Sequence, residues 1–251
     1  MLSIKNLEAK ANDKIIINNI DLNIADGDII TIMGQNGTGK STLCKILIGD
    51  ENYEVTNGSI LFNNEDLLKM SPNERSIKGI FLINQSPIAV EGVTNAELLR
   101  AALKERTGKP VNIFAFNKEM ESICEMLELP KSFIHREVNL GCSGGERKKT
   151  ELLHMWMLKP KMIILDEIDS GLDVDALKIC AQSLKEYYKE YNPSILIVTH
   201  HLDILKTLKP NKVCVMKKGE IIDTGDYKLA EKIEKYGFSN KNELSELENH
   251  E

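Results

Sequence analysis

The fold of this chain is decided by Gly34-Gln35-Asn36-Gly37-Thr38-Gly39-Lys40-Ser41-Thr42. This stretch matches the P-loop pattern of a glycine, four residues, a second glycine, a lysine and a serine or threonine. The glycines let the backbone curl so that successive N–H groups point at phosphate oxygens. Lys40 adds a positive charge for the terminal phosphates, and Ser41 offers a hydroxyl to Mg²⁺. The sequence therefore predicts a site for a nucleoside triphosphate and Mg²⁺.

The segments on either side of this loop have the character that a P-loop needs. Ile29–Met33 is an apolar run typical of a buried strand, and Lys40–Ile48 has a helical pattern. The N-terminus of that helix faces the phosphates, where its dipole favours negative charge. A chance glycine-rich turn is the competing interpretation, and the strand, the Lys-Ser pair and the helix together argue against it.

Length, charge and cysteine usage limit the classes of protein. With 251 residues the chain can form one large domain, or a domain with a subdomain, and a net charge of −6 does not indicate nucleic-acid binding. The longest apolar runs, such as Ile195–Val198, are too short to span a bilayer, and Met1–Asn6 has no signal-peptide core. The five cysteines are scattered and form no C-x-x-C pair, which favours a reducing cytoplasm and gives no metal site.

Apolar runs of strand character alternate with helical patterns along the chain. Strands are predicted at Leu2–Leu7, Ile15–Ile24, Ser59–Phe62, Ile80–Ile83, Met162–Leu165, Ser194–Val198, Val213–Met216 and Glu220–Ile222. Helices are predicted at Pro72–Lys78, from Thr94 onward, at Asn117–Leu129, from about Ser143 to Leu158, at Asp173–Tyr191 and at Leu202–Leu208. This alternation predicts an α/β fold with a mostly parallel sheet covered on both faces. The polar, acidic end at 239–251 predicts a frayed or disordered tail.

Polar residues follow several of the predicted strands. Asp166 and Glu167 follow Met162–Leu165, and in a P-loop ATPase an acid on the strand next to the P-loop holds Mg²⁺. Asp166 takes that role, and Glu167 is then placed to orient or deprotonate the attacking water. His200 could contact the γ-phosphate, and Gln85 could report on Mg²⁺ and the water. Taken singly, each of these residues could equally be a solvated or structural side chain.

A further motif, Ser143-Gly144-Gly145-Glu146, turns these separate signals into a pattern. Together with the P-loop, Gln85, Asp166-Glu167, Ser170-Gly171-Leu172-Asp173 and His200, in that order, it resembles the motif series of the ABC-type ATPases. The resemblance covers nearly the whole chain. It implies a nucleotide-binding core at 1–85 and 159–238 with an antiparallel β subdomain, an inserted helical subdomain at 86–158, and a flexible tail at 239–251.

The same resemblance implies a transient, ATP-dependent homodimer in which two subunits face head to tail. ATP then lies between the P-loop of one subunit and the signature loop of the other, formed by Ser143, Gly144, Gly145 and Glu146. Ser170 and Asp173 contact the facing subunit. The implied catalytic residues are Glu167, His200 and Gln85, and the implied Mg²⁺ ligands are Ser41, Gln85 and Asp166. A glycine-rich loop that opens a helix is an anion cradle, so ATP joins the two subunits.

Two departures from the family pattern affect these implications. Cys142 stands where the family usually has leucine. The aromatic residue that commonly stacks on adenine is missing, and Ala11-Asn12 lie near its expected place. Stacking on the base is therefore expected to be weak, which leaves the base selectivity of the site open.

A narrower resemblance is to the SufC family, the ATPases of the Suf iron–sulfur cluster assembly system. It rests on the segments His135–Lys149, Asp166–Leu177, Gly79–Leu82 and Gly225-Asp226, followed by Glu234–Phe238. It implies a cytoplasmic ATPase that works with a SufB–SufD scaffold, without nucleic acid and without insertion into a membrane. Cys142 departs from this family's pattern too, since the SufC family usually has phenylalanine at that position. The sequence has no iron–sulfur ligand set, which agrees with a cluster built on the partners.

Other functions and contacts compete with this interpretation. The chain could be the nucleotide-binding subunit of a membrane importer, or an ATP-gated binding module with negligible turnover. The second of these is disfavoured because Lys40, Asp166, Glu167 and His200 are all present. The apolar segment Ser86–Val93 is either a docking patch or a packed loop. The basic run Arg147-Lys148-Lys149 is either a solvated face or a source of a lysine that pairs with the acids near Glu167 in the ATP-free monomer.

Overall fold

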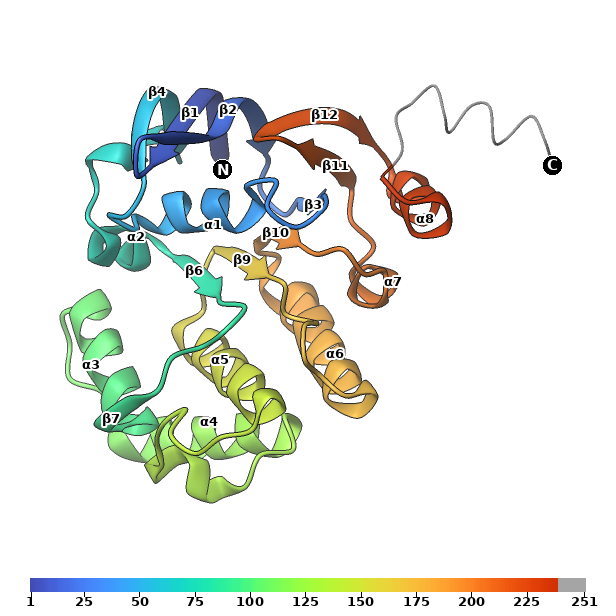
Figure 1. The fold of residues 1–251 in the computed structure, drawn as a ribbon. Coiled ribbons are helices and arrows are strands. Elements are labelled where there is room, and N and C mark those ends of the chain that lie inside the picture. Colours follow the sequence, from blue (N-terminus) through green and yellow to red (C-terminus); the bar gives the residue numbers. More distant parts are fainter. Residues whose placement is uncertain (239–251) are drawn as a thin grey trace.

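The computed structural model describes residues 1–238, and the tail expected at 239–251 lies outside the described residues (Figure 1). The larger sheet has six strands in the order β12-β11-β3-β10-β9-β6. These strands are β3 (Ile29–Met33), β6 (Ile80–Ile83), β9 (Met162–Asp166), β10 (Ser194–Val198), β11 (Lys212–Lys217) and β12 (Glu220–Gly225). All neighbours pair in parallel except β11 and β12, so the prediction of a mostly parallel sheet is confirmed.

The parallel strands place the site at one edge of this sheet. Every residue of β3, β9 and β10 is buried, as expected for strands covered by helices on both faces. The carboxyl ends of β3, β6, β9 and β10 meet at the same edge. The loops that follow these strands therefore come together, at the place where open α/β sheets bind ligands.

A second, antiparallel sheet covers the P-loop helix. Its order is β2-β1-β4-β5, from β1 (Leu2–Ala11), β2 (Lys14–Ile24), β4 (Glu54–Phe62) and β5 (Glu65–Asp66). The helix α1 (Lys40–Ile48) lies between the two sheets (Figure 1). Leu43 and Leu47 of α1 share one core with Ile4 of β1 and Ile32 of β3. This packing holds the start of α1, and the loop before it, against β2.

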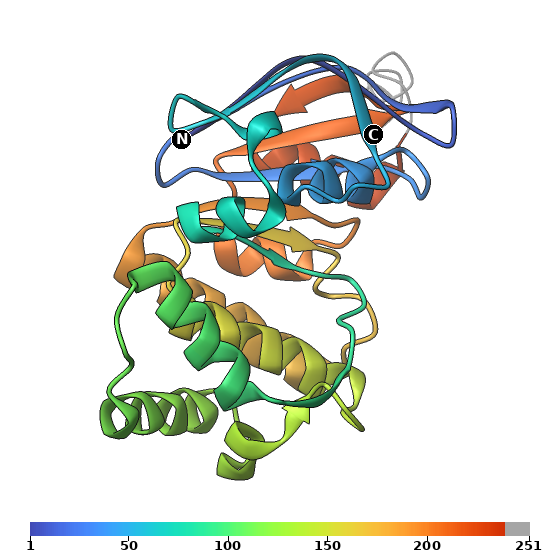
Figure 2. The same ribbon diagram turned by 90° about the vertical axis from the view of Figure 1, so that its left-hand side faces the viewer.

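The helical part of the chain lies at the end of the molecule opposite the antiparallel sheet (Figure 2). It contains α3 (Asn95–Thr107), α4 (Ile113–Met126), the 3₁₀ helix η2 (Lys131–His135) and α5 (Gly144–Leu158), with a small hairpin of β7 (Val90–Thr94) and β8 (Glu137–Val138). The remaining helices are η1 (Leu67–Lys69), α2 (Pro72–Lys78), α6 (Val174–Tyr191), α7 (Asp203–Leu208) and α8 (Tyr227–Tyr236). None of the helices within residues 1–238 has the length and apolar character needed to cross a bilayer.

Several boundaries differ from those predicted. The predicted helix at Asn117 begins at Ile113, because Asn112 caps it by accepting a hydrogen bond from the Ala115 N–H at 3.1 Å. The strand predicted at Ser59 begins at Glu54, where its pairing with β1 starts. The hairpin β7–β8 and the helix α8 had no counterpart in the prediction. β8 has only two residues, too few to show a periodic pattern.

A buried histidine joins the helices of the helical part. His154 of α5 lies with its Nε2 atom 2.7 Å from Oδ1 of Asn95, the first residue of α3. The amide nitrogen of Asn95 donates to the carbonyl oxygens of Phe133 and Arg136 at 2.9 and 3.2 Å. Its Oδ1 is therefore the acceptor, and Nε2 of His154 carries the proton. Burial lowers the pKa of His154 to about 4, so the imidazole is neutral at physiological pH.

We expect His154 to make the folded chain less stable as the pH falls. The unfolded histidine binds its proton below about pH 6.5, whereas the folded one stays neutral down to about pH 4. The stabilising contribution is full above pH 6.5 and declines by about 3 kcal/mol toward pH 4. His154→Gln keeps an N–H donor for Asn95 and does not titrate. Urea unfolding from pH 7 to 4 should show the parent losing stability relative to this variant.

Comparing the parent with His154→Gln also removes the contribution of a neighbouring carboxyl group to the pH dependence of stability. Burial raises the pKa of Glu151, three residues earlier on α5, to about 7, and this favours the folded chain at the acidic end of the range. Glu151 is present in both proteins, so its effect cancels in the difference. A difference that stays flat between pH 7 and 4 would contradict the assignment of a neutral buried imidazole.

Candidate active site

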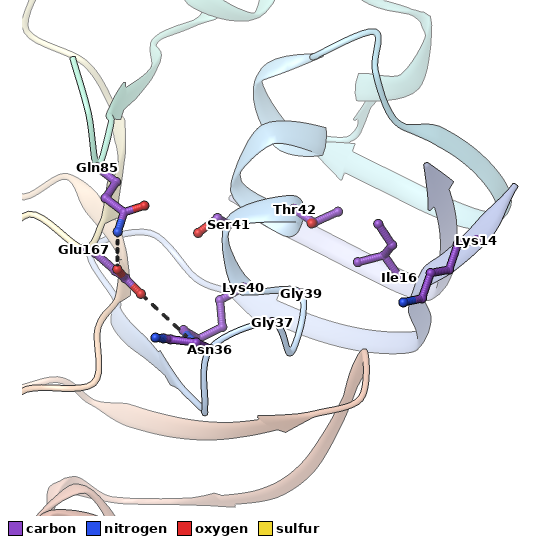
Figure 3. Close-up of a pocket in the computed structure, with 10 residues that line it drawn as sticks. All are labelled: Lys14, Ile16, Asn36, Gly37, Gly39, Lys40, Ser41, Thr42, Gln85 and Glu167. Carbon is purple, nitrogen blue, oxygen red and sulfur yellow. Dashed lines mark hydrogen bonds and ion pairs between the residues drawn. The ribbon is translucent and has the colours of Figure 1, made fainter. Parts of the chain in front are cut away.

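A pocket of about 430 Å³ opens at the carboxyl edge of the six-stranded sheet. Figure 3 shows the residues that line it, with Gln85 and Glu167 on one side of the P-loop and two residues of β2 on the other. The lining residues are Lys14, Ile16, Asn36, Gly37, Gly39, Lys40, Ser41, Thr42, Gln85 and Glu167. Most of the predicted P-loop residues therefore share one cavity with two of the predicted catalytic residues.

The P-loop holds its lysine against its own backbone. The ammonium of Lys40 donates to the carbonyl oxygens of Gly34 and Gln35 at 2.8 and 3.0 Å, and the Thr38 hydroxyl donates to the Gln35 carbonyl at 2.9 Å. Burial lowers the pKa of Lys40, against the attraction of Glu167 and Asp166. Gly39, which caps α1, has a φ of 105°, where any other residue is strained. The loop geometry thus requires the glycine that the motif supplies.

Asp166 and Ser41 meet beside the start of α1. The Ser41 hydroxyl donates to Oδ1 of Asp166 at 2.8 Å, which links α1 to the end of β9. Asp166 is 1% exposed, and burial raises its pKa, while the hydrogen bond from Ser41 lowers it. A carboxylate and a hydroxyl side by side are the oxygen ligands that Mg²⁺ accepts, together with the phosphates of a nucleotide. The residues present therefore fit a Mg²⁺ site.

Glu167 is the meeting point of the other predicted catalytic residues. The Gln85 amide donates to its Oε2 at 2.6 Å, and the Lys40 ammonium lies 3.9 Å from its Oε1 (Figure 3). Nδ1 of His200 lies 3.6 Å from the same Oε1. The backbone of Glu167 is left-handed, with a φ of 47°, and its N–H donates to the Val198 carbonyl at 2.9 Å. A carboxylate so placed can accept a proton from a water at the γ-phosphate.

Two residues that sequence reasoning missed support the His200 turn. The Thr199 hydroxyl donates to Oδ2 of Asp169 at 2.6 Å, and the His201 N–H donates to the Thr199 oxygen at 3.0 Å. Asp169 and Thr199 are both buried. They join the loop after β9 to the loop after β10, and so fix Glu167 and His200 relative to each other. Their place beside the predicted residues is the signal that could have found them.

The signature loop lies apart from the pocket of its own chain. Ser143 caps α5 by accepting from the Glu146 N–H at 3.3 Å, while the Glu146 carboxylate accepts from the Ser143 N–H at 2.8 Å. A Cβ placed on Gly144 would meet only the Gly171 carbonyl, at 3.5 Å. Asp173 caps α6 through the Ala176 N–H at 2.8 Å. The structure thus groups the signature loop with the Ser170–Asp173 loop, and neither lines the nucleotide pocket of the same chain.

Within residues 1–238, neither Lys148 nor Lys149 forms an ion pair with the acids near Glu167, although Asp166 and Asp169 attract the Lys148 ammonium. The Lys148 ammonium donates instead to the Asn84 carbonyl, next to Gln85. Burial lowers the pKa of Lys148, against the attraction of Glu151, Asp166 and Asp169. The physical reason is competition: Gln85, Lys40 and His200 already surround the Glu167 carboxylate.

The segment Ser86–Val93 is partly packed and partly exposed. The Asn139 amide donates to the Ile88 carbonyl at 2.9 Å, and Val90 pairs with Val138 in the β7–β8 hairpin. The Ile88 side chain is 76% exposed. Both interpretations of this segment therefore describe part of it: the backbone packs as a loop, and the side chain of Ile88 is free to meet a partner.

We expect Lys40→Ala and Lys40→Arg to weaken nucleotide binding by at least about tenfold, because a charge-assisted contact with the phosphates is lost. Arginine keeps the charge, but its planar guanidinium does not fit a site that holds a compact ammonium between two carbonyls. Titration of each variant with MgADP measures the effect. Lys45→Ala, on the last turn of the same helix, is the control. Parent-like affinity in both Lys40 variants would refute the assignment.

Comparison with known proteins gives relatives over almost the whole chain. The family described as ABC transporter matches residues 17–170. A probable ATP-dependent transporter ycf16 from Antithamnion sp. is 44% identical over 95% of this chain and 96% of its own. The probable ATP-dependent transporter SufC of Escherichia coli is 41% identical, over 95% and 97%. The iron–sulfur cluster assembly protein SufC of Plasmodium falciparum is 42% identical, over 95% of this chain and 70% of its own.

A solved structure agrees with the described fold. A dimeric ATP-binding cassette in a post-hydrolysis state, bound to ADP and phosphate, superposes with a TM-score of 0.78 over 90% of this chain and 98% of its own. At 23% identity this similarity establishes the fold alone. The resemblance derived from the motifs and the arrangement of the described elements therefore lead to the same architecture.

Proposed function

Because this chain belongs to the ABC transporter family and is an ATP hydrolase, we propose that it is the ATPase of a Suf-type iron–sulfur cluster assembly system. The observation that carries this proposal is 41–42% identity to two relatives named SufC, over 95% of this chain in each case. In this role the chain works in the cytoplasm with a SufB–SufD scaffold. ATP-driven closure of two copies changes the arrangement of the scaffold, and hydrolysis resets it.

In this proposal the P-loop binds the triphosphate and Lys40 turns from the carbonyls of Gly34 and Gln35 to the terminal phosphates. The two oxygens that accept from its ammonium here are neutral carbonyls. A charged phosphate oxygen accepts a stronger hydrogen bond from the ammonium, so the exchange is favourable. Ser41, Asp166 and Gln85 would hold Mg²⁺, which neutralises charge on the β- and γ-phosphates when bound. The amide oxygen of Gln85 would be its Mg²⁺ ligand, since its amide nitrogen donates to Glu167 here.

Glu167 then accepts the proton of the attacking water. Its carboxylate is 7% exposed and faces Lys40, so it lies at the end of the pocket where the γ-phosphate is expected. His200 lies beside the same carboxylate oxygen and can contact the γ-phosphate through its imidazole. Asp169 and Thr199 are positioning residues. The hydrogen bond between their side chains holds the loops that carry Glu167 and His200.

The second subunit completes the site. Ser143 and Gly144 are exposed, and they lie outside the nucleotide pocket of their own chain. In a head-to-tail pair, the N-terminus of α5 would bring its free N–H groups and positive dipole end to the γ-phosphate of the facing subunit. Catalysis thus depends on dimer closure, which is the step that couples ATP to the scaffold.

The alternative is the nucleotide-binding subunit of a membrane importer, favoured by the relatives that are named probable ATP-dependent transporters. The two functions differ in partner. The tagged chain, expressed with SufB and SufD and separately in cells with native membranes, should co-purify with the scaffold and increase its ATPase rate on binding it. Recovery only with membrane proteins, with no change in rate on adding SufB–SufD, would favour the importer.

A further inference from the structure

We propose that this chain binds purine nucleotides without preferring adenine, and that Lys14 and Ile16 of β2 form its base site. The inference rests on the proposed function only in that the P-loop holds the phosphates of a nucleotide. Neither residue belongs to any motif found in the sequence. Both line the same pocket as the P-loop, Gln85 and Glu167.

The position of the base follows from the position of the phosphates. Glu167 and Gln85 mark the γ-phosphate end of the pocket, with Lys40 beside them. Figure 3 shows Lys14 and Ile16 on the opposite side of the P-loop, with the Lys14 ammonium pointing toward Gly37 and Gly39. A nucleotide with its phosphates in the loop therefore extends its sugar and base toward β2.

The base site is held rigidly to the P-loop. The Asn18 N–H donates to the Gly219 carbonyl at 2.9 Å, and the Gly219 N–H donates to the Thr38 carbonyl at 2.9 Å. These two bonds tie β2 to the P-loop through the turn between β11 and β12. A Cβ on Gly39 would lie 3.1 Å from the Ile16 carbonyl, so the loop and the strand are already in close contact. Lys14 and Ile16 are two residues apart on β2 and both line the pocket, with a change of register between β1 and β2 at Ile16.

The side chains at this end offer a surface for any purine. Ile16 is half-buried and presents an apolar surface, and the described lining residues of the pocket include no aromatic ring. Lys14 is exposed and ends in an ammonium, which donates hydrogen bonds and accepts none. The other polar lining residue with a long reach, Asn36, lies on the Lys40 and Glu167 side in Figure 3.

This chemistry does not select adenine. Guanine presents two acceptors, N7 and O6, which a lysine can contact together, whereas adenine presents the acceptor N7 beside an amino donor. A site rejects a competing ligand strongly only when its own groups form hydrogen bonds that the competitor cannot make. Neither Lys14 nor Ile16 has an acceptor for the adenine amino group. Guanine nucleotides should therefore bind at least as well as adenine nucleotides.

Calorimetric titration of the full chain with MgADP and MgGDP tests the inference without hydrolysis or scaffold. We expect the two dissociation constants of the parent to agree within about threefold, or GDP to bind more tightly. Lys14→Met keeps the aliphatic stem and should weaken GDP by about tenfold, with ADP affected less. Ile16→Tyr adds a stacking ring and should tighten both nucleotides by about tenfold. Lys5→Met, on β1 outside the pocket, is the control and should change neither.

Two results would overturn the inference. ADP binding that exceeds GDP binding by more than about threefold would show that the site prefers adenine. An equal loss of both nucleotides in Lys14→Met would mean that the ammonium contacts a phosphate. The proposed function fails separately: equal binding of both nucleotides, with no effect of SufB–SufD on the ATPase rate, would refute the Suf assignment and leave the base site intact. If neither MgADP nor MgGDP binds, both the base site and the proposed function are refuted.

Discussion

Glu167→Gln should bind MgATP like the parent and hydrolyse it at least about a hundred times more slowly, because the attacking water loses its base. The substitution is nearly isosteric. Its amide oxygen can still accept from the Gln85 amide, which donates to Oε2 of Glu167 at 2.6 Å in the parent. Asp166 and Ser41, which fit the Mg²⁺ site, are unchanged. The expected loss is therefore one of chemistry, with binding retained.

Phosphate release under single-turnover conditions measures the hydrolysis rate, and gel filtration with MgATP measures assembly. Because the closed state can no longer hydrolyse its nucleotide, the variant should accumulate as an ATP-bound dimer, whereas the parent should not. Glu186→Gln, at a half-buried position of α6 outside the nucleotide pocket, is the matched control and should behave like the parent. A Glu167→Gln protein that turns over ATP at the parental rate would remove Glu167 from the mechanism.

The architecture could be predicted from the sequence because it depends on the local hydrophobic pattern and on the order of the strands. Apolar runs such as Met162–Leu165 predicted buried parallel strands, and parallel strands bring their carboxyl ends to one edge. The meeting of Gln85, Asp166 and Glu167 around the P-loop follows from that rule alone. The start of the helix predicted at Pro72 was also legible, because the capping box that begins it joins Ser71 to Glu74, only three residues later.

The contacts that escaped sequence reasoning are those set by packing between distant segments. The sequence left Lys148 either on a solvated face or paired with the acids near Glu167, whereas it lies buried and its ammonium donates to the Asn84 carbonyl. Lys14 and Ile16 showed only as ordinary strand residues, because their place beside the P-loop depends on how β2 meets the turn at Gly219. Hydrogen-bond partners this far apart in sequence leave no periodic signal.

The isolated chain should hydrolyse ATP slowly, and its rate per subunit should rise with its concentration. The signature loop lies outside the pocket of its own chain, so a monomer binds ATP without the N–H groups of Gly144 and Gly145. A single missing donor of this kind costs on the order of 10²-fold in rate. Activity per subunit should therefore be measured across dilution, with and without SufB–SufD. The scaffold should raise it further by holding two copies together.

Mixing two inactive variants gives the sharpest test of the shared site. Lys40→Ala spoils the P-loop and leaves the signature loop intact. Gly144→Asp does the reverse, because its carboxylate would face the γ-phosphate of the facing subunit. A Cβ at Gly144 meets only one carbonyl, at 3.5 Å, and an acid in the first turn of α5 suits the helix dipole, so this variant should fold. Each mixed dimer then contains one complete site, made from the P-loop of one variant and the signature loop of the other.

Random pairing in an equal mixture should restore about a quarter of the parental rate, since half of the dimers are mixed and each has one working site of two. The control replaces the Lys40→Ala chain by a chain that carries both substitutions, which can complete no site and should restore nothing. Rescue with the single variant and none with the double variant would establish that each ATP is hydrolysed between two subunits. A mixture as inactive as its components, or a parental rate that is high and independent of concentration, would refute the dimer mechanism.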